Sequence, residues 1–201
     1  MLRVGLTGGL ATGKSFVGKV LEELGCHLIR ADELGHQVLA PGGEAYEAVV
    51  REFGPGILDE KGAIDRRKLA AEVFDNPERL ALLTSLVHPP VFRREKAWME
   101  EIGRQDPEGI AVVEAAILIE TGHYKHYDRL IVTVCDEPLQ IERAMRRDHL
   151  TEQEVRARLS RQMPLQEKMK YADYVIDTSG SKEKTIGKVR EVYDSLRSAV
   201  K

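Results

Sequence analysis

The chain is poor in cysteine and aromatic residues, and it has no long uninterrupted apolar run. Its two cysteines, Cys26 and Cys135, stand alone without the spacing of metal ligands, so we expect reduced thiols that behave as small apolar side chains. The longest apolar stretch, IAVVEAAILI, is broken by Glu114, and no apolar segment of the signal-peptide type stands at the N-terminus. These absences predict a cytoplasmic protein with no membrane span and no membrane partner.

An excess of positive charge is also missing, since the formal net charge is −3. Such a chain has no global positive field to attract nucleic acid, which we therefore do not expect as a partner. Hydrophobic residues make up 42% of the 201 positions, which is enough for the core of one domain with modest insertions.

The segment GLTGGLATGKS, residues 5–15, has the spacing Gly-x-x-x-x-Gly-Lys-Ser. An apolar strand pattern precedes it and a helical pattern follows it, which is the context of a phosphate-binding loop. Backbone N–H groups and the helix N-terminus would face the phosphates, Lys14 would contact the β- and γ-phosphates, and the Ser15 hydroxyl would bind Mg²⁺. The alternative is a glycine-rich turn that only connects strand to helix. The loop alone does not separate a kinase from a GTPase or an ATP-driven motor.

Strand and helix patterns alternate along the chain, which predicts an α/β fold built from βαβ units. The core is expected at 1–34, 109–136 and 171–201, and Ser181 is expected to cap the last helix. Apolar runs typical of buried parallel strands lie near Leu2–Thr7, His27–Ala31, Ile110–Ile119, Arg129–Val134 and Tyr174–Asp177.

Residues 35–108 separate the second and third expected strands by far more than one crossover helix needs. EAYEAVVREF and PPVFRREKAWMEEIGR have helical spacing, and the GPGILDEKGAI segment between them is rich in turn residues. Insertions at strand ends often carry substrate specificity, so we expect a helical substrate-binding insertion. Alternatively, this segment only covers the edge of the sheet.

Residues 137–170 form a second expected insertion, which is rich in arginine. Arg143 and Arg147 share one helical face, and Thr151 with Glu154 has the spacing of a capping box that begins a second helix. Two such helices can close as a lid over a triphosphate, where guanidinium groups neutralise the transferring phosphoryl group. A solvated basic helix is the alternative.

Asp32 directly follows the second expected strand, a position that faces the ligand crevice of a parallel sheet. Its carboxylate can accept a proton from a substrate hydroxyl, hold a water of the Mg²⁺ shell, or serve as the N-cap of the next helix. The guanine-reading sequence Asn-Lys-x-Asp of a GTPase is absent. The residues alone thus predict a small-molecule kinase with ATP as donor and an unidentified acceptor.

Taken in order, these landmarks resemble the dephospho-coenzyme A kinase family over essentially the whole chain. Besides GLTGGLATGKS, the resemblance rests on Ala31-Asp32, IDRRKLAAEVF, LTSLVHPPVF, ILIETG, QIERAMRRD, Gln162 and ADYVIDTSG. It implies a P-loop NTPase-type parallel sheet with helices on both faces, a helical acceptor-binding insertion and a small helical lid. It also implies Mg²⁺- and ATP-dependent phosphorylation of the ribose 3′-hydroxyl of dephospho-coenzyme A, the last step of coenzyme A biosynthesis.

The resemblance also implies roles for single residues. Asp32 matches the catalytic base, and Lys14 and Arg143 match the other catalytic residues. Arg66 and His88, with Asp32, match the acceptor side, and Ser15 matches the Mg²⁺ ligand. The residues implied in ATP binding are Gly8, Gly9, Ala11, Thr12, Gly13, Lys14, Ser15, Phe16, Arg147, Thr178 and Gly180.

Four positions depart from the residues usual in the family: Ala11, Phe16, Arg30 and Ala116. Ala11 stands where glycine is common, so the loop must avoid positive φ there or accept strain. The expected partners are ATP and dephospho-coenzyme A, and the chain is expected to be a monomer or a small homo-oligomer. Two other classes stay open on the residues: a kinase for a nucleoside or another metabolite, and a nucleotide-binding switch without an acceptor.

Overall fold

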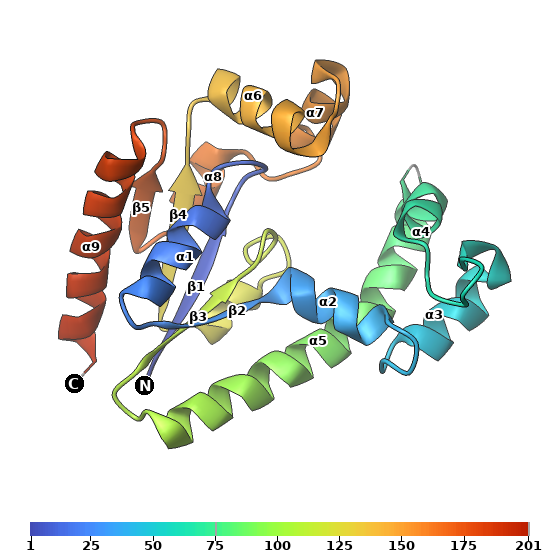
Figure 1. Cartoon of the computed structure of the whole chain (residues 1–201), viewed down its shortest axis with the longest axis horizontal. Coiled ribbons are helices and arrows are strands. Elements are labelled where there is room, and N and C mark those ends of the chain that lie inside the picture. The colour runs from blue at the N-terminus through green and yellow to red at the C-terminus, as the bar shows by residue number, and fades with distance from the viewer. Residues whose placement is uncertain (75, 201) are drawn as a thin grey trace. The chain divides into compact units, whose positions relative to one another are not determined.

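The computed structural model describes residues 1–74 and 76–200, and the chain divides into two compact units (Figure 1). The core unit comprises Met1–Ile29 and Met99–Lys201, and the helical unit comprises Arg30–Trp98. The helical unit therefore begins and ends somewhat earlier than the expected insertion at 35–108.

A five-stranded sheet with the order β2-β3-β1-β4-β5 forms the centre of the core unit. The pairs β1–β3, β1–β4 and β4–β5 are parallel, and β1 is the middle strand. The predicted α/β class and the five predicted strands are thus confirmed. The strands are β1 (Leu2–Gly8), β2 (His27–Arg30), β3 (Ile110–Glu114), β4 (Arg129–Val134) and β5 (Tyr174–Asp177).

The largest error in the predicted strands concerns β3, which ends at Glu114 and not near Ile119. The chain turns after Glu114, since the N–H of Thr121 donates to the carbonyl of Ile117 at 3.1 Å. An apolar run does not by itself distinguish a buried strand from the buried turn that follows it. Two other ends differ by one residue, since β1 continues to Gly8 and β2 stops at Arg30, and the ends of β4 and β5 match the prediction.

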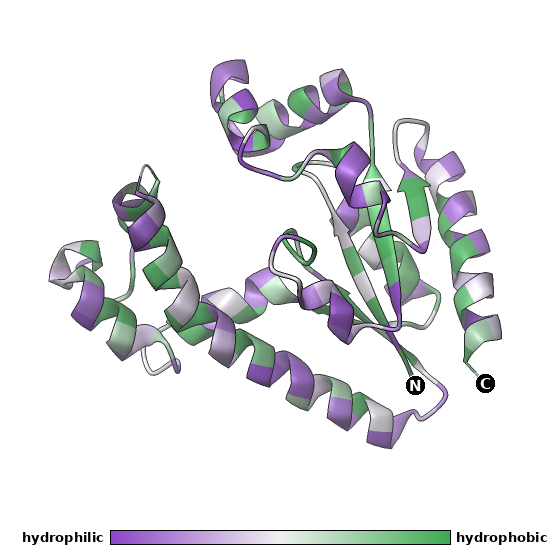
Figure 2. Cartoon of the chain, turned by 180° about the vertical axis from the view of Figure 1, so that it is seen from behind, coloured by the Kyte–Doolittle hydropathy of each residue, from purple (hydrophilic) through white to green (hydrophobic). Residues whose placement is uncertain are grey.

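Two helices, α1 (Lys14–Glu23) and α9 (Lys182–Ala199), share one apolar core with the sheet. Val17 and Leu21 of α1 and Leu196 of α9 are fully buried in it with Val4 of β1. Figure 2 shows the pattern that makes this possible, with mostly hydrophobic strands and helices that alternate hydrophobic and polar stripes. Ser181 caps α9 as predicted, because its side chain accepts from the N–H of Lys184.

The opposite face of the sheet is covered by the segment between β3 and β4, which includes η2 (His123–His126). A Cβ at Gly5 of β1 would lie 2.9 Å from side-chain atoms of both Leu130 and Tyr127 and 3.1 Å from Leu118. Glycine at this position lets those side chains pack directly on the central strand. The remaining helices of the unit are α6 (Glu137–Asp148), α7 (Glu152–Leu159), α8 (Leu165–Met169) and the C-terminal part of α5 (Pro77–Gln105).

Apart from Arg30, the last residue of β2, the described residues of the helical unit belong to no named strand, and Leu58 and Ile64 form an isolated bridge. Its buried side chains include Val38, Val49 and Phe53, which lie along the apolar stripes of their helices. Its elements are α2 (Ala31–Leu39), α3 (Tyr46–Phe53), η1 (Pro55–Ile57), α4 (Arg66–Val73) and the N-terminal part of α5.

The two segments predicted to be helical, EAYEAVVREF and PPVFRREKAWMEEIGR, lie largely in α3 and α5 respectively.

Across residues 1–74 and 76–200, none of the helices combines the length and apolarity needed to cross a bilayer.

Candidate active site

The Gly-rich segment forms the loop between the carboxyl end of β1 and the N-terminus of α1. Gly8 must lack a side chain, because a Cβ there would lie 2.2 Å from Oγ1 of Thr133 and 2.6 Å from Oγ1 of Thr12. Gly13 is the N-cap of α1 and has a φ of 83°, a left-handed conformation that favours glycine. The loop thus has the backbone path that a phosphate-binding loop needs.

Ala11 has a φ of 55°, so the loop accepts strain at the position where the sequence left two possibilities open. Its packing supplies a reason for a methyl group here. Ala11 and Leu10 pack against the small apolar core of α6 and α7, which is formed by Ile141, Ala144 and Val155. Burial of the methyl group offsets part of the backbone strain.

The Lys14 ammonium lies at the inner side of the loop. Its Nζ donates to the carbonyl of Gly9 at 3.1 Å, and Oγ1 of Thr12 donates to the same carbonyl at 3.0 Å. Lys14 is the first residue of α1, so its charge adds to the partial positive charge of the helix N-terminus. This combination can bind the phosphates of a nucleotide.

Ser15 donates its hydroxyl hydrogen to Oε1 of Glu114, with an Oγ–Oε1 distance of 2.6 Å. Glu114 is buried and is the last residue of β3, the neighbour of β1. Sequence reasoning noted Glu114 only as an interruption of an apolar run. The signal that could have identified it is a single carboxylate at the carboxyl end of a buried strand.

The pair Ser15–Glu114 fits Mg²⁺ by its chemistry, since both side chains offer hard oxygen ligands. Mg²⁺ in nucleotide sites is usually held by one or two protein oxygens, with water and phosphate oxygens as the other ligands. Within the part of the chain that the structure describes, no group of three His, Cys, Asp or Glu side chains gathers as a complete protein cage.

Arg143 of α6 is held against the loop after β5. Its Nη1 donates to Oγ1 of Thr178 at 2.9 Å, and its Nη2 donates to the Thr178 carbonyl at 2.8 Å. The Thr178 hydroxyl in turn donates to the carbonyl of Thr12 at 3.0 Å. Thr178 therefore connects Arg143 to the phosphate loop, and Gly180 lies two residues further on in the same loop.

Arg147 lies one turn further along α6 than Arg143 and is exposed. Its Nε donates to Oδ1 of Asp148 at 2.8 Å, and this contact lowers the pKa of Asp148. The capping box predicted for the next helix is present, with Thr151 and Glu154 bonded reciprocally at the start of α7. The segment thus begins with the two short helices expected, and the added helix α8 leads back to β5.

The three residues expected on the acceptor side lie in the helical unit. Asp32 is exposed in the first turn of α2, whose N-cap is Arg30, so the reading of Asp32 as the N-cap is wrong. The N-cap lies two residues earlier than expected, because β2 ends at Arg30 and the helix begins directly after it at Ala31. Arg66 is exposed at the start of α4, and the His88 ring lies 5.4 Å from the Phe92 ring within α5.

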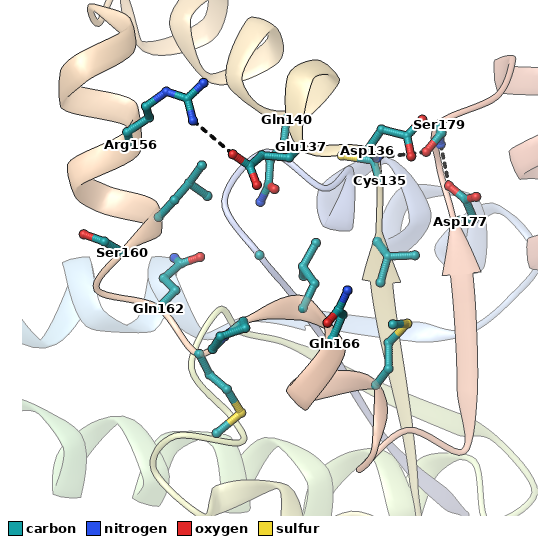
Figure 3. A pocket seen from close by; sticks show the side chains of 17 residues that line it. Cys135, Asp136, Glu137, Gln140, Arg156, Ser160, Gln162, Gln166, Asp177 and Ser179 are labelled. Atoms are coloured by element: carbon teal, nitrogen blue, oxygen red, sulfur yellow. Dashed lines mark hydrogen bonds and ion pairs between the residues drawn. The ribbon is translucent and has the colours of Figure 1, made fainter.

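A cavity of about 780 Å³ lies beside the phosphate loop in the core unit (Figure 3). It is lined by Gly9, by Gln140 of α6 and Arg156 of α7, and by Leu165 and Met169 of α8, among others. Its wall is braced by an ion pair of 3.0 Å between Arg156 and Glu137. Lys14, Ser15 and Arg143 do not line it, so the cavity is a neighbour of the phosphate site and not the site itself.

A phosphate loop at the carboxyl end of the central strand of a parallel sheet, with an arginine-bearing helix beside it, defines a nucleotide-binding protein of the P-loop kinase type. Comparison with known proteins is more specific. The family model described as dephospho-CoA kinase matches residues 2–184, and the chain belongs to that family.

Relatives named dephospho-CoA kinase support the same assignment. The one from Aquifex aeolicus is 43% identical over 197 residues, which is 98% of both chains. The one from Geobacillus kaustophilus is 44% identical over 184 residues, or 92% of this chain and 91% of the relative.

Solved structures agree with the sequence comparison. A crystal structure of a Thermus thermophilus protein is 30% identical, covers 97% of each chain and has a TM-score of 0.84. Dephospho-CoA kinase from Campylobacter jejuni is 26% identical, covers 98% of each chain and has a TM-score of 0.73. A shikimate kinase from Acinetobacter baumannii, 18% identical with a TM-score of 0.51, shares the fold alone.

Proposed function

We propose that the chain transfers the γ-phosphoryl group of ATP to the ribose 3′-hydroxyl of dephospho-coenzyme A, with Mg²⁺ as the metal. Membership of the dephospho-CoA kinase family supports the overall reaction. The observation that carries the assignment of residues is the convergence of three groups on one loop: the Lys14 ammonium, the Ser15–Glu114 oxygen pair and the Arg143–Thr178 contact.

In this proposal the core unit binds the donor. Backbone N–H groups of the loop and the Lys14 ammonium hold the phosphates, and the Arg143 guanidinium stabilises charge on the transferring group. Ser15 and Glu114 would hold Mg²⁺, directly or through water, and the bound ion would neutralise charge on the β- and γ-phosphates. The proposed ATP site is completed by other residues of the loop and by three residues outside it: Gly8, Gly9, Ala11, Thr12, Gly13 and Phe16, and Arg147, Thr178 and Gly180.

The helical unit supplies the acceptor side of the proposal. Asp32 follows the carboxyl end of β2 and would accept the proton of the 3′-hydroxyl at its carboxylate as phosphoryl transfer proceeds. Arg66 and His88 would bind other groups of dephospho-coenzyme A. The lid segment, residues 137–170, would exclude water, which otherwise competes with the hydroxyl as acceptor.

The free cysteines bear on the cell compartment in which the chain acts. Both cysteines are free thiols, which agrees with a reducing compartment, and we propose the cytoplasm. We also propose that the chain acts as a monomer or a small homo-oligomer, without nucleic acid or a membrane as partner.

A panel of acceptors tests the proposal. The rate of ADP release from ATP and Mg²⁺ is measured with dephospho-coenzyme A, adenosine, shikimate or no acceptor. We expect strong stimulation by dephospho-coenzyme A alone. If another hydroxyl metabolite stimulated ADP release, that metabolite would be the acceptor in place of dephospho-coenzyme A. A slow rate that no metabolite changes would indicate a nucleotide-binding switch.

A further inference from the structure

Lys168 of α8 is a fully buried lysine in direct contact with the phosphate loop. Its side chain is 0% exposed, and its Nζ lies 3.3 Å from the carbonyl oxygen of Gly8 and 3.0 Å from that of Ala116. Nζ also forms an ion pair of 2.8 Å with Oε1 of Glu120. An ammonium group has three N–H donors, and three oxygens surround this one.

Burial of an ammonium group is costly unless an opposite charge and hydrogen bonds compensate for lost water. A buried apolar residue would fill the same space without this cost. The buried ammonium of Lys168 therefore points to a role beyond packing. The carbonyl of Gly8 suggests which use, because Gly8 is the first fixed glycine of the phosphate loop.

The contact with Gly8 sets the direction of a peptide unit. No cis peptide bond occurs in the described residues, so the N–H of Gly9 points opposite to the Gly8 carbonyl in the plane of their shared peptide. Because Lys168 holds that carbonyl, the N–H of Gly9 is directed away from Lys168.

Gln162 holds the next peptide unit by its N–H group. Its Oε1 accepts from the N–H of Leu10 at 2.9 Å. The carbonyl of that peptide belongs to Gly9 and points the opposite way, where it accepts from Nζ of Lys14 at 3.1 Å. One peptide plane therefore links Gln162 on its outer side to the Lys14 ammonium on its inner side.

We propose that Lys168, with its partner Glu120, and Gln162 are positioning residues for the phosphate loop. They hold two successive peptide units from outside, so that the Gly9 carbonyl and the Lys14 ammonium are preorganised before the nucleotide binds. The inference rests on the proposed function, since it assumes that the loop binds a nucleotide. It gives the segment between the lid helices and β5 a role in donor binding.

The test compares Lys168→Met with Lys170→Met. Lys170 lies two residues further on, is exposed, and its ammonium forms an ion pair with Glu167. The dissociation constant of MgADP is measured by calorimetry without any acceptor, and kcat and KM for ATP are measured with dephospho-coenzyme A. Both variants are first shown to be folded by circular dichroism at the assay temperature.

We expect Lys168→Met to weaken MgADP binding and to raise KM for ATP about tenfold or more, a size typical of misplaced binding groups. Lys170→Met should match the wild type, and Lys168→Arg should recover part of the loss. A lower melting temperature with unchanged MgADP affinity would overturn the inference, because a merely structural lysine behaves in that way.

Two milder variants keep the test decisive if Lys168→Met does not fold. Gln162→Leu removes the acceptor for the Leu10 N–H, and Glu120→Gln removes the charge that faces Lys168. Each should weaken MgADP binding, and unchanged affinity in both would overturn the inference. If the wild type does not phosphorylate dephospho-coenzyme A but these variants still lose MgADP affinity, the proposed function fails and the positioning role stands.

Discussion

The Ser15 hydroxyl and the Glu114 carboxylate meet at 2.6 Å where the phosphate loop adjoins the carboxyl end of β3. The two residues are 99 positions apart in the chain and are brought together because β1 and β3 are adjacent parallel strands. This arrangement places a neutral and an anionic oxygen side by side at the start of α1, where we propose that Mg²⁺ binds.

Glu114→Gln tests that proposal, since it keeps the size of the side chain and removes its charge. We expect kcat to fall about 10–100-fold and the Mg²⁺ concentration for half-maximal rate to rise, as for other groups that orient metal ligands. Mg²⁺ titrations of the initial rate provide the measurement. Glu23→Gln, at the exposed end of α1, is the control, and an unchanged Mg²⁺ requirement in Glu114→Gln would refute the metal assignment.

Asp32→Asn tests the proposed base. We expect kcat to fall about 10²–10⁴-fold, the usual contribution of a general base, while KM for ATP stays close to that of the wild type. Glu33→Gln is a matched control, because Glu33 is the adjacent exposed acid in the same first turn of α2. If steady-state kinetics show that Asp32→Asn keeps its kcat, another group accepts the proton.

Arg143→Ala tests the guanidinium that Thr178 holds against the phosphate loop. We expect a larger loss in kcat than in the affinity for dephospho-coenzyme A, because the charge is needed most as the phosphoryl group transfers. Arg146→Ala, on an exposed position of the same helix, should leave both parameters unchanged. An effect of Arg143→Ala on KM for the acceptor alone would contradict a role in transfer.

Ala11 combines a strained backbone with a packed methyl group, so substitutions there separate the two effects. Ala11→Gly relieves the left-handed strain but loses the methyl contact, and we expect its unfolding free energy to stay within about 1 kcal/mol of the wild type. Ala11→Val should destabilise the chain more, since β-branched residues strongly disfavour positive φ. Urea denaturation gives both values, and equal stability of the valine variant would show that the loop does not hold a φ of 55°.

Asp128 provides a pH-dependent prediction. Arg3 donates to its carboxylate through Nε at 3.1 Å, Nη2 at 2.7 Å and the backbone N–H at 2.9 Å, and these bonds lower the pKa of Asp128. The stabilisation is therefore complete above the unfolded pKa of about 4 and is lost as pH falls through the lower folded pKa. The partly exposed pair contributes about 1 kcal/mol, so Asp128→Asn should lose that much at neutral pH and progressively less in acid.

Predictions from the sequence were correct where the pattern involved residues close together in the chain. The capping box of Thr151 and Glu154 involves residues three positions apart, and it is present as predicted. The phosphate loop likewise depends on residues within one short segment, and its surrounding strand and helix were identified correctly. The reading of Asp32 as an N-cap failed because it depended on the last residue of β2, and such boundaries shift by a residue.

Contacts between distant segments could not be obtained from the same patterns. Glu114 and Ser15 meet only because the sheet places β3 beside β1. The local sequence of neither segment predicts which strands are neighbours in the sheet. Lys168 lies in a short polar helix, where nothing in the spacing distinguishes a fully buried lysine from an exposed one. The link from Arg143 through Thr178 to Thr12 similarly joins three segments that only the fold brings together.

The most direct test of the central claim uses dephospho-coenzyme A and its 3′-deoxy analogue as acceptors in parallel, with ATP and Mg²⁺. ADP release and the mass of the acceptor are followed together. The proposed function predicts rapid ADP release and gain of one phosphate with dephospho-coenzyme A, and neither with the analogue. Phosphorylation of the 3′-deoxy analogue, or no phosphorylation of either compound, would contradict it.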